Sequence, residues 1–329
     1  MNRRLLVLAS LSALPLGVWL GCGDDQPPPL SPADSGTDGM TSDGAVTDGS
    51  TSDVVDLDAP FDAGPAVCAQ PMSFGAGAAV PNVSTPQTDH FGAITADELT
   101  IAWMNAAGTV LYAERTKPTE PFGATKSLAV GFALDRVALS ADGLTMIGVL
   151  TDRSTFAQVK RNARTDAFAL PLDSTPFKFL NMPNGGTEDG GADAGSTVAD
   201  PVLSADGKVF YFSLLGGPPE TVAESLRLGG SFYPSPRVLK QTDLVSAGAK
   251  HRRPTGLSVD GRTLFFWDES TSTERAAFRE SVTIPGKLDF TTFVTLGAFP
   301  GAQPSQTCGR LYFESPGSGG VDLFVADRK

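Results

Sequence analysis

The chain has 329 residues, enough for one large or two ordinary domains, and 41% of them are hydrophobic. Its formal net charge is −12. This acidic balance does not supply the basic face that nucleic-acid binding requires, so we expect no nucleic-acid partner.

The first segment, residues 1–21, has the features of a signal peptide. Two arginines precede an uncharged apolar run from Leu5 to Gly21. The run has 17 residues and contains Pro15 and Gly17, whereas a membrane-spanning helix needs about 20 residues. A cleaved signal therefore fits the segment better than the alternative, a retained anchor helix.

The end of this segment, Trp19-Leu20-Gly21-Cys22, resembles the lipobox of bacterial lipoproteins, in which the cysteine is acylated and becomes the mature N-terminus. The family usually has Leu where this chain has Trp19. The resemblance implies that Cys22 is the lipid attachment site and that the protein is held at the cell envelope, anchored to the outer membrane on its periplasmic or surface side. An ordinary signal peptide with a chance cysteine is the alternative.

Residues 22–66 are predicted to be the lipidated N-terminus and a disordered acidic tether. From Asp24 to Ala66 the chain has ten aspartates and no Lys, Arg, Glu or aromatic residue except Phe61. Such a segment cannot bury enough apolar surface to offset its ordering entropy. A coil of about 45 residues has a typical reach of about 35 to 40 Å. Its Asp-Gly pairs complete no calcium-binding loop, so we expect no metal site and no cofactor.

Residues 67–329 are predicted to form one all-β domain, because a single pattern recurs along them. An apolar strand leads into a Ser/Thr-x-Asp-Gly turn, which leads into a second apolar strand. Glycine tolerates the positive φ of a tight turn, and the Ser and Asp side chains bond its free backbone groups. The clear copies are Leu139–Met146, Leu203–Phe210 and Leu257–Leu264, with weaker copies at Ile94–Ile101 and, shortened at the turn, at Ser305–Phe313.

Aromatic residues follow the turn aspartates at similar distances. Four phenylalanines lie 25, 26, 26 and 30 residues after the aspartates of their copies, namely Phe122, Phe168, Phe232 and Phe290. Each copy thus predicts four strands in about 45 to 55 residues, the size of one propeller blade. The Gly- and Asp-rich stretch Asn184–Gly195 is interpreted as an inserted loop. We therefore expect a β-propeller of five blades, each with four antiparallel strands, with six blades as the alternative.

The last copy ends at Lys329 without a fourth strand. Phe74-Gly75-Ala76 matches Phe122-Gly123-Ala124, so we expect the N-terminal strand to complete the last blade and remove an exposed sheet edge. This closure brings Cys68 to Cys308, and we expect a disulfide between them in an oxidising compartment. Two buried free thiols are the alternative.

The Leu-Ser-Ala-Asp-Gly turns and the Phe-Tyr-Phe strand resemble the WD-like propeller repeats of the TolB type, which are found in bacterial envelope proteins. The resemblance covers roughly residues 74–329. It implies a propeller that binds proteins, peptides or glycans on its open faces, and it does not imply an enzyme.

Catalytic motifs are missing from the sequence, and we assign no catalytic residue. The two histidines precede the turn aspartates of their copies by seven and nine residues, which places both near the start of an innermost strand, beside the central channel. They either belong to a polar binding mouth or are loop residues that face water. The candidate mouth residues are His90, Asp135, Asp200, His251, Arg252 and Arg253.

These observations favour a non-catalytic binding or scaffold protein, held at the membrane by its lipid anchor. Its partner would be an envelope protein, a peptide or a glycan. A carbohydrate- or peptide-acting propeller enzyme with its site over the channel is the alternative, because dispersed acidic and basic residues leave no motif. A structural part of a larger envelope assembly is the third possibility.

Overall fold

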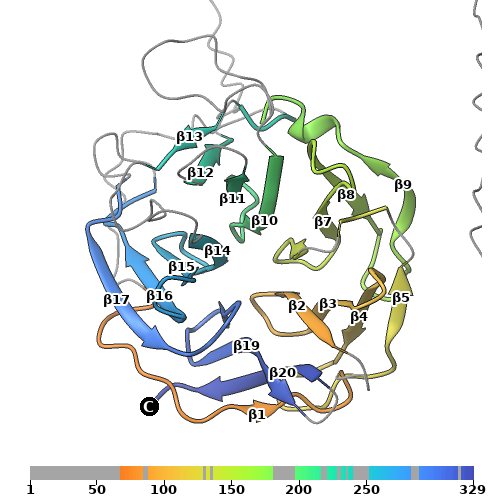
Figure 1. Cartoon of the computed structure of the whole chain (residues 1–329). Helices are drawn as coiled ribbons and strands as arrows, with labels where there is room; N and C mark the ends of the chain where they lie inside the picture. The colour runs from red at the N-terminus through yellow and green to blue at the C-terminus, as the bar shows by residue number, and fades with distance from the viewer. Residues whose placement is uncertain are drawn as a thin grey trace, which may run out of the picture. The chain divides into compact units, whose positions relative to one another are not determined.

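The computed structural model shows a ring of five sheets (Figure 1). In its described part, the chain forms twenty β-strands and a single 3-10 turn, η1 (Thr175–Phe177). The predictions of an all-β propeller and of five blades are confirmed, and the alternative of six blades is wrong. The structure describes residues 67–83, 88–128, 131–133, 136–180, 197–215, 221–227, 231–234, 236–239, 252–282, 289–317 and 320–329.

Within these ranges, no helix has the length and apolar character needed to cross a membrane. The predicted signal peptide, Cys22, the acidic tether and the whole inserted loop lie outside the described residues.

Each blade is an antiparallel sheet (Figure 1). From the channel to the rim, the strands follow chain order in blades 1 to 4, whereas blade 5 has β1 as its outer strand. Blade 1 contains β2 (Asp89–Ile94), β3 (Thr100–Asn105), β4 (Val110–Glu114) and β5 (Lys126–Leu128), and blade 2 contains β6 (Ala138–Leu139), β7 (Thr145–Val149), β8 (Phe156–Lys160) and β9 (Ala169–Asp173). Blade 3 contains β10 (Thr197–Leu203), β11 (Val209–Leu215), β12 (Thr221–Leu226) and β13 (Arg237–Val238). Blade 4 contains β14 (Arg252–Leu257), β15 (Thr263–Asp268), β16 (Thr273–Phe278) and β17 (Thr292–Gly297), and blade 5 contains β18 (Gln303–Pro304), β19 (Arg310–Gly317), β20 (Gly320–Asp327) and β1 (Ala78–Ala79).

The hydrophobic core lies between neighbouring blades. Phe156 of blade 2 packs edge-on against two residues of blade 3, with ring centroids 4.9 Å from Phe210 and 5.3 Å from Phe212. Sheets packed on both sides need apolar side chains on both faces, which explains why the second strands show no alternation of polar and apolar residues.

The N-terminal strand closes the ring. Strand β1 pairs with β20, with Ala78 opposite Val325, and so supplies the outer strand of the last blade. The backbone N–H of Gly75 donates to the carbonyl of Asp327 at 2.8 Å, just as Gly123 donates to Glu114 in blade 1. The match between the two Phe-Gly-Ala segments therefore predicted the correct register, and the closure is confirmed.

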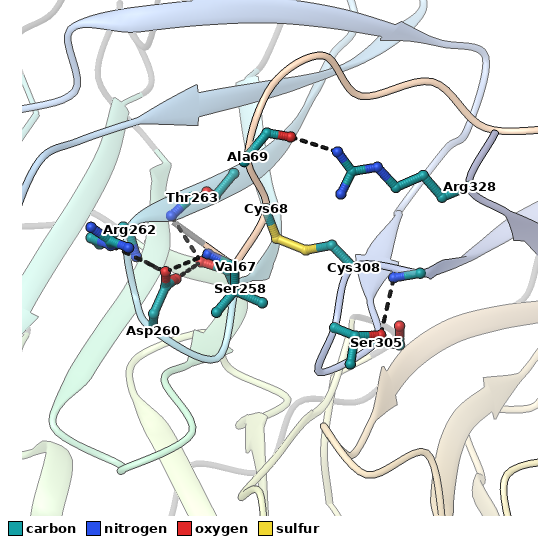
Figure 2. The surroundings of a disulfide bond; sticks show 12 residues. Val67, Cys68, Ala69, Ser258, Asp260, Arg262, Thr263, Ser305, Cys308 and Arg328 are labelled. Atoms are coloured by element: carbon teal, nitrogen blue, oxygen red, sulfur yellow. Dashed lines mark hydrogen bonds and ion pairs between the residues drawn. A yellow bond between two sulfur atoms is a disulfide. The ribbon is translucent and has the colours of Figure 1, made fainter. Parts of the chain in front are cut away.

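A disulfide lies where the chain joins this ring (Figure 2). The structure bonds Cys68 to Cys308, whose Cα atoms are 5.4 Å apart, and both residues are fully buried. The N–H of Val67 donates to Oδ2 of Asp260 in blade 4 at 3.0 Å, and Arg328 Nη2 donates to the carbonyl of Ala69 at 2.6 Å. The start of the domain is thereby attached to two blades at once.

The five turns between first and second strands share one hydrogen-bond network. In blade 2, the Ser140 hydroxyl donates to Asp142 Oδ1 at 2.6 Å and accepts from the N–H of Thr145 at 2.9 Å. In blade 5, Ser305 accepts the equivalent bond from Arg310 N at 3.1 Å. The last copy is therefore not shortened at its turn: Thr307 and Cys308 take the places of the aspartate and the glycine.

An arginine after each third strand ties the first four turns to the rim. In blade 2, Arg161 Nε donates to the carbonyl of Gly143 at 2.8 Å while its guanidinium lies 4.5 Å from the ring centre of Phe168. In blade 3, Arg227 lies 4.9 Å from the ring centre of Tyr233. The prediction of Phe232 for this position is wrong: Phe232 is exposed, and its neighbour Tyr233 is the buried aromatic.

Candidate binding site at the channel mouth

The two ends of the channel have different chemistry. We call the end where strands β2, β10 and β14 begin the mouth end, and the end that carries the five turns the turn end. At the mouth end lies a cavity of about 290 Å³, to which each blade contributes a polar or charged side chain. In blade order these side chains are His90, Arg136, Asp200, Arg253 and Glu314.

Of the six residues predicted to form the mouth, the structure brings three together at this cavity: His90, Asp200 and Arg253. Arg252 does not line it. Successive side chains of a strand point to opposite faces, and Arg252 Nε lies 3.2 Å from Asp268 Oδ2 instead. Asp135 and His251 lie outside the described residues.

Sequence reasoning missed the other half of the site. Arg136 directly follows Asp135, and Trp267, Glu269 and Glu314 lie in or just beyond second strands, which end at the mouth. The residues predicted from the sequence all lie in or just before first strands. A useful signal was the change from apolar to charged residues at the ends of β15 and β19, because second strands return the chain to the mouth end.

Arg136 lines the cavity and is hydrogen-bonded to three other blades. Its Nη2 donates to three backbone carbonyls, those of Gly92 in blade 1 at 3.3 Å, Thr255 in blade 4 at 3.2 Å and Gly301 in blade 5 at 2.7 Å. One guanidinium from blade 2 therefore connects three other blades across the channel. Gly301 adopts φ +71°, and an added Cβ would lie 2.6 Å from Arg136 Nη1, so both the backbone conformation and the close approach favour glycine here.

The carboxylates of the wall are held by neighbouring groups. Glu314 Oε1 accepts the N–H of Phe91 at 2.8 Å, and its Oε2 lies 3.9 Å from His90 Nδ1. Glu269 forms a 3.0 Å ion pair with Arg253. These contacts fix charges of both signs around one small cavity, which suits recognition of a polar ligand.

A fully buried carboxyl lies behind the wall. Burial raises the pKa of Glu274 to about 8, and the nearby groups that oppose this shift are the hydroxyl of Thr255, the charge of Arg136 and the N–H of Ala302. Thr255 donates its hydroxyl hydrogen to Glu274. Glu274 is therefore mostly protonated at pH 7 and supports the mouth-lining Thr255 from the interior.

The turn end of the channel is narrow and is lined mainly by residues with uncharged, mostly apolar side chains. Its cavity of about 50 Å³ is formed by the ends of the five innermost strands, with Leu139, Val202 and Leu257 among its lining residues. Across the described ranges, no cluster of three or more His, Cys, Asp or Glu side chains is arranged to hold a metal ion. The mouth, with its charged lining, is the candidate site.

Comparison with known proteins gives structural neighbours only. No family model and no curated protein sequence matches the chain. Similar solved structures include TolB from Acinetobacter baumannii, at 14% identity and a TM-score of 0.41, with 75% of this chain and 56% of that chain covered. They also include the calcium-binding protein regucalcin from Agrobacterium tumefaciens, at 12% identity and a TM-score of 0.42, with 76% and 74% covered.

A third similar structure is a putative 6-phosphogluconolactonase from Bacteroides fragilis, at 14% identity and a TM-score of 0.39, with 73% of this chain and 67% of that chain covered. The chain spans just over half the length of TolB. The assignment of the fold rests on the chain's own sheets and their order, and TolB is among the solved structures that resemble it.

Proposed function

We propose that this protein is a lipid-anchored, non-catalytic propeller of the bacterial envelope that binds a small polar ligand, or a polar segment of a larger partner, at its mouth. The observation that carries the proposal is the 290 Å³ cavity, to which every blade contributes a polar or charged side chain. Ligand sites characteristically combine a concave surface with a few fixed polar groups.

The position of the N-terminus supports this arrangement. The described chain begins at Val67, which bonds Asp260 in the turn of blade 4, and Cys68 is bonded to Cys308 in the turn of blade 5. The described chain therefore begins at the turn end of the propeller, opposite the mouth. The lipobox-like Trp19–Cys22 segment supports the anchor itself.

The alternative, a carbohydrate- or peptide-acting enzyme, is favoured by the pair of His90 and Glu314 at the same cavity. A histidine beside a carboxylate is a common proton-transferring pair. Against it, Glu314 already accepts a hydrogen bond from Phe91 N, and Glu269 is paired with Arg253. These contacts fit fixed recognition groups better than groups that must exchange protons.

The anchor is tested by fractionation and mass spectrometry of the protein expressed in a bacterium. We expect acylation at Cys22 and recovery with membranes, and we expect Cys22→Ala to appear in the soluble fraction. An unmodified Cys22 in membrane-free protein would overturn the lipid anchor.

The mouth is tested by screening amines, amino acids, peptides and sugars for an increase in melting temperature. We expect a ligand whose effect is lost in Arg253→Gln and retained in Lys208→Gln, an exposed turn-end residue that serves as the matched control. Chemical conversion of that ligand by the wild-type protein, and not by His90→Asn, would favour the enzyme instead.

A further inference from the structure

The mouth carries more acidic than basic side chains. Asp200, Glu269 and Glu314 face Arg136 and Arg253, so formal negative charge exceeds positive charge by one. Both guanidinium groups are engaged, Arg136 by three carbonyls and Arg253 by Glu269. Each guanidinium still has a buried Nε that makes no hydrogen bond among the described residues. It is therefore the negative charge of the wall that disfavours an anionic ligand.

Acceptors at the cavity are also incompletely used. Asp200 is only 2% exposed, and its Oδ2 accepts from the Ser213 hydroxyl at 2.8 Å, which leaves Oδ1 without a donor among the described residues. Glu314 Oε2 is 3.9 Å from His90 Nδ1, beyond ordinary hydrogen-bond length. The cavity therefore favours a ligand that donates hydrogen bonds and carries positive charge.

Trp267 adds an aromatic wall to the same cavity. Elsewhere in the described part of the propeller, cations lie over aromatic rings, for example Arg161 over Phe168 at 4.5 Å and Lys178 over Phe232 at 4.1 Å. Trp267, by contrast, takes part in none of the cation–π or ring–ring contacts among the described residues. Tryptophan has the strongest cation–π interaction of the aromatic side chains, and carboxylates beside such a ring are a recurring arrangement for binding ammonium groups.

We propose that the mouth binds an organic ammonium group, placed against Trp267 and near the carboxylates of Asp200 and Glu314. The inference rests on the proposed function and specifies the ligand chemistry of the same cavity. A metal ion fits less well, because the described residues hold no cluster with three ligating side chains. An amine carries its own hydrogens and needs only dispersed acceptors.

The test is isothermal titration calorimetry on the full-length protein with matched probes. Nα-acetyl-lysine methylamide carries one ammonium group, and the same compound acetylated at Nε carries none. We expect the cationic probe to bind at least ten times more tightly than the neutral one, and its affinity to fall as salt rises from about 50 to 500 mM. Equal affinities for the two probes would overturn the inference.

Matched variants locate the binding. We expect Trp267→Leu to weaken the cationic probe about tenfold, Trp267→Phe to weaken it two- to fivefold because a π face remains, and Glu314→Gln to weaken it at least fivefold. Lys208→Gln should bind as the wild type does. Circular dichroism and melting temperature identify variants that remain folded, and wild-type affinity in a folded Trp267→Leu protein would contradict the inference.

Two further probes identify the source of the amine. Ethanolamine represents a small ammonium compound, and a tripeptide with a central lysine represents a polypeptide side chain. Tighter binding of either one supports the inference and names the source. If a neutral sugar or peptide binds instead and loses affinity in Glu314→Gln, the ammonium inference fails while the proposed function stands. If no compound depends on the mouth residues, both fail.

Discussion

The turn end and the mouth end of this propeller differ in how regularly the five blades contribute side chains to them. At the turn end, five copies of one hydrogen-bond network repeat around the ring, as in Thr95 and Thr100 of blade 1 and Ser204 and Val209 of blade 3. At the mouth end, no two blades contribute the same set of side chains to the cavity. Repetition marks the end that stabilises the sheets, and variation marks the end available for recognition.

The exceptions at the turn end lie at the closure of the ring. Glu98 and Cys308 occupy turn positions where three blades have glycine, with φ of +61° and +52°. Glu98 accepts bonds from Tyr312 and Arg310 of blade 5, each at 2.7 Å, and Cys308 forms the disulfide. Both side chains join segments that the repeat alone does not connect, which offsets the cost of a left-handed conformation.

Removing the disulfide should have the largest effect on stability. It closes a loop across 240 residues of sequence, and the double variant Cys68→Ser/Cys308→Ser is expected to lose about 3 to 5 kcal/mol of unfolding free energy. Urea unfolding with and without reductant measures this loss. Identical curves for the oxidised and reduced wild-type protein would show that the closure does not depend on the bond.

The pH dependence of Glu274 should be nearly as large. Its pKa is about 8 in the folded protein and near 4.5 when unfolded, so the stability from the buried neutral acid is fully present below about pH 4.5 and is lost as pH rises through 8. We expect this group to remove about 3 kcal/mol of unfolding free energy between pH 5 and 8. Glu274→Gln, which is neutral at every pH, should abolish that part of the slope; an unchanged slope would contradict the assignment.

Paired serines within blade 2 compare the two ends directly. Ser140→Ala at the turn end removes bonds to Asp142 and Thr145 and should cost about 1 to 2 kcal/mol. Ser154 lies in the exposed hairpin at the mouth end and bonds only Asp152, so Ser154→Ala should cost less than about 0.5 kcal/mol. Equal losses, measured by urea unfolding, would remove the distinction between the two ends.

The smallest effect on stability is expected for His90→Asn. The His90 side chain is 51% exposed, so the change should alter the unfolding free energy by less than about 0.5 kcal/mol. A ligand found in the screen should nevertheless bind this variant more weakly. A marked loss of stability without any change in binding would assign His90 to the scaffold.

Much of the scaffold was determined by local sequence. The Ser-x-Asp-Gly turns, the apolar second strands and the matching Phe-Gly-Ala segments led to five blades and to closure by the N-terminal strand, because these patterns act over a few residues and then repeat. The two wrong predictions about the repeat also had local causes. Phe232 was chosen in place of Tyr233 because the two aromatic residues are adjacent. The last turn was expected to be shortened because Thr307 and Cys308 do not match the Asp-Gly pattern.

Which residues meet at the candidate site was determined by the tertiary structure. His90, Asp200 and Arg253 were predicted from their place near the start of first strands, but Arg136, Trp267 and Glu314 reach the same cavity from other positions. Their meeting depends on how five sheets are rotated around one axis, which no local pattern encodes. Arg136 shows the physical reason most clearly, because its three carbonyl partners lie 44, 119 and 165 residues away along the chain.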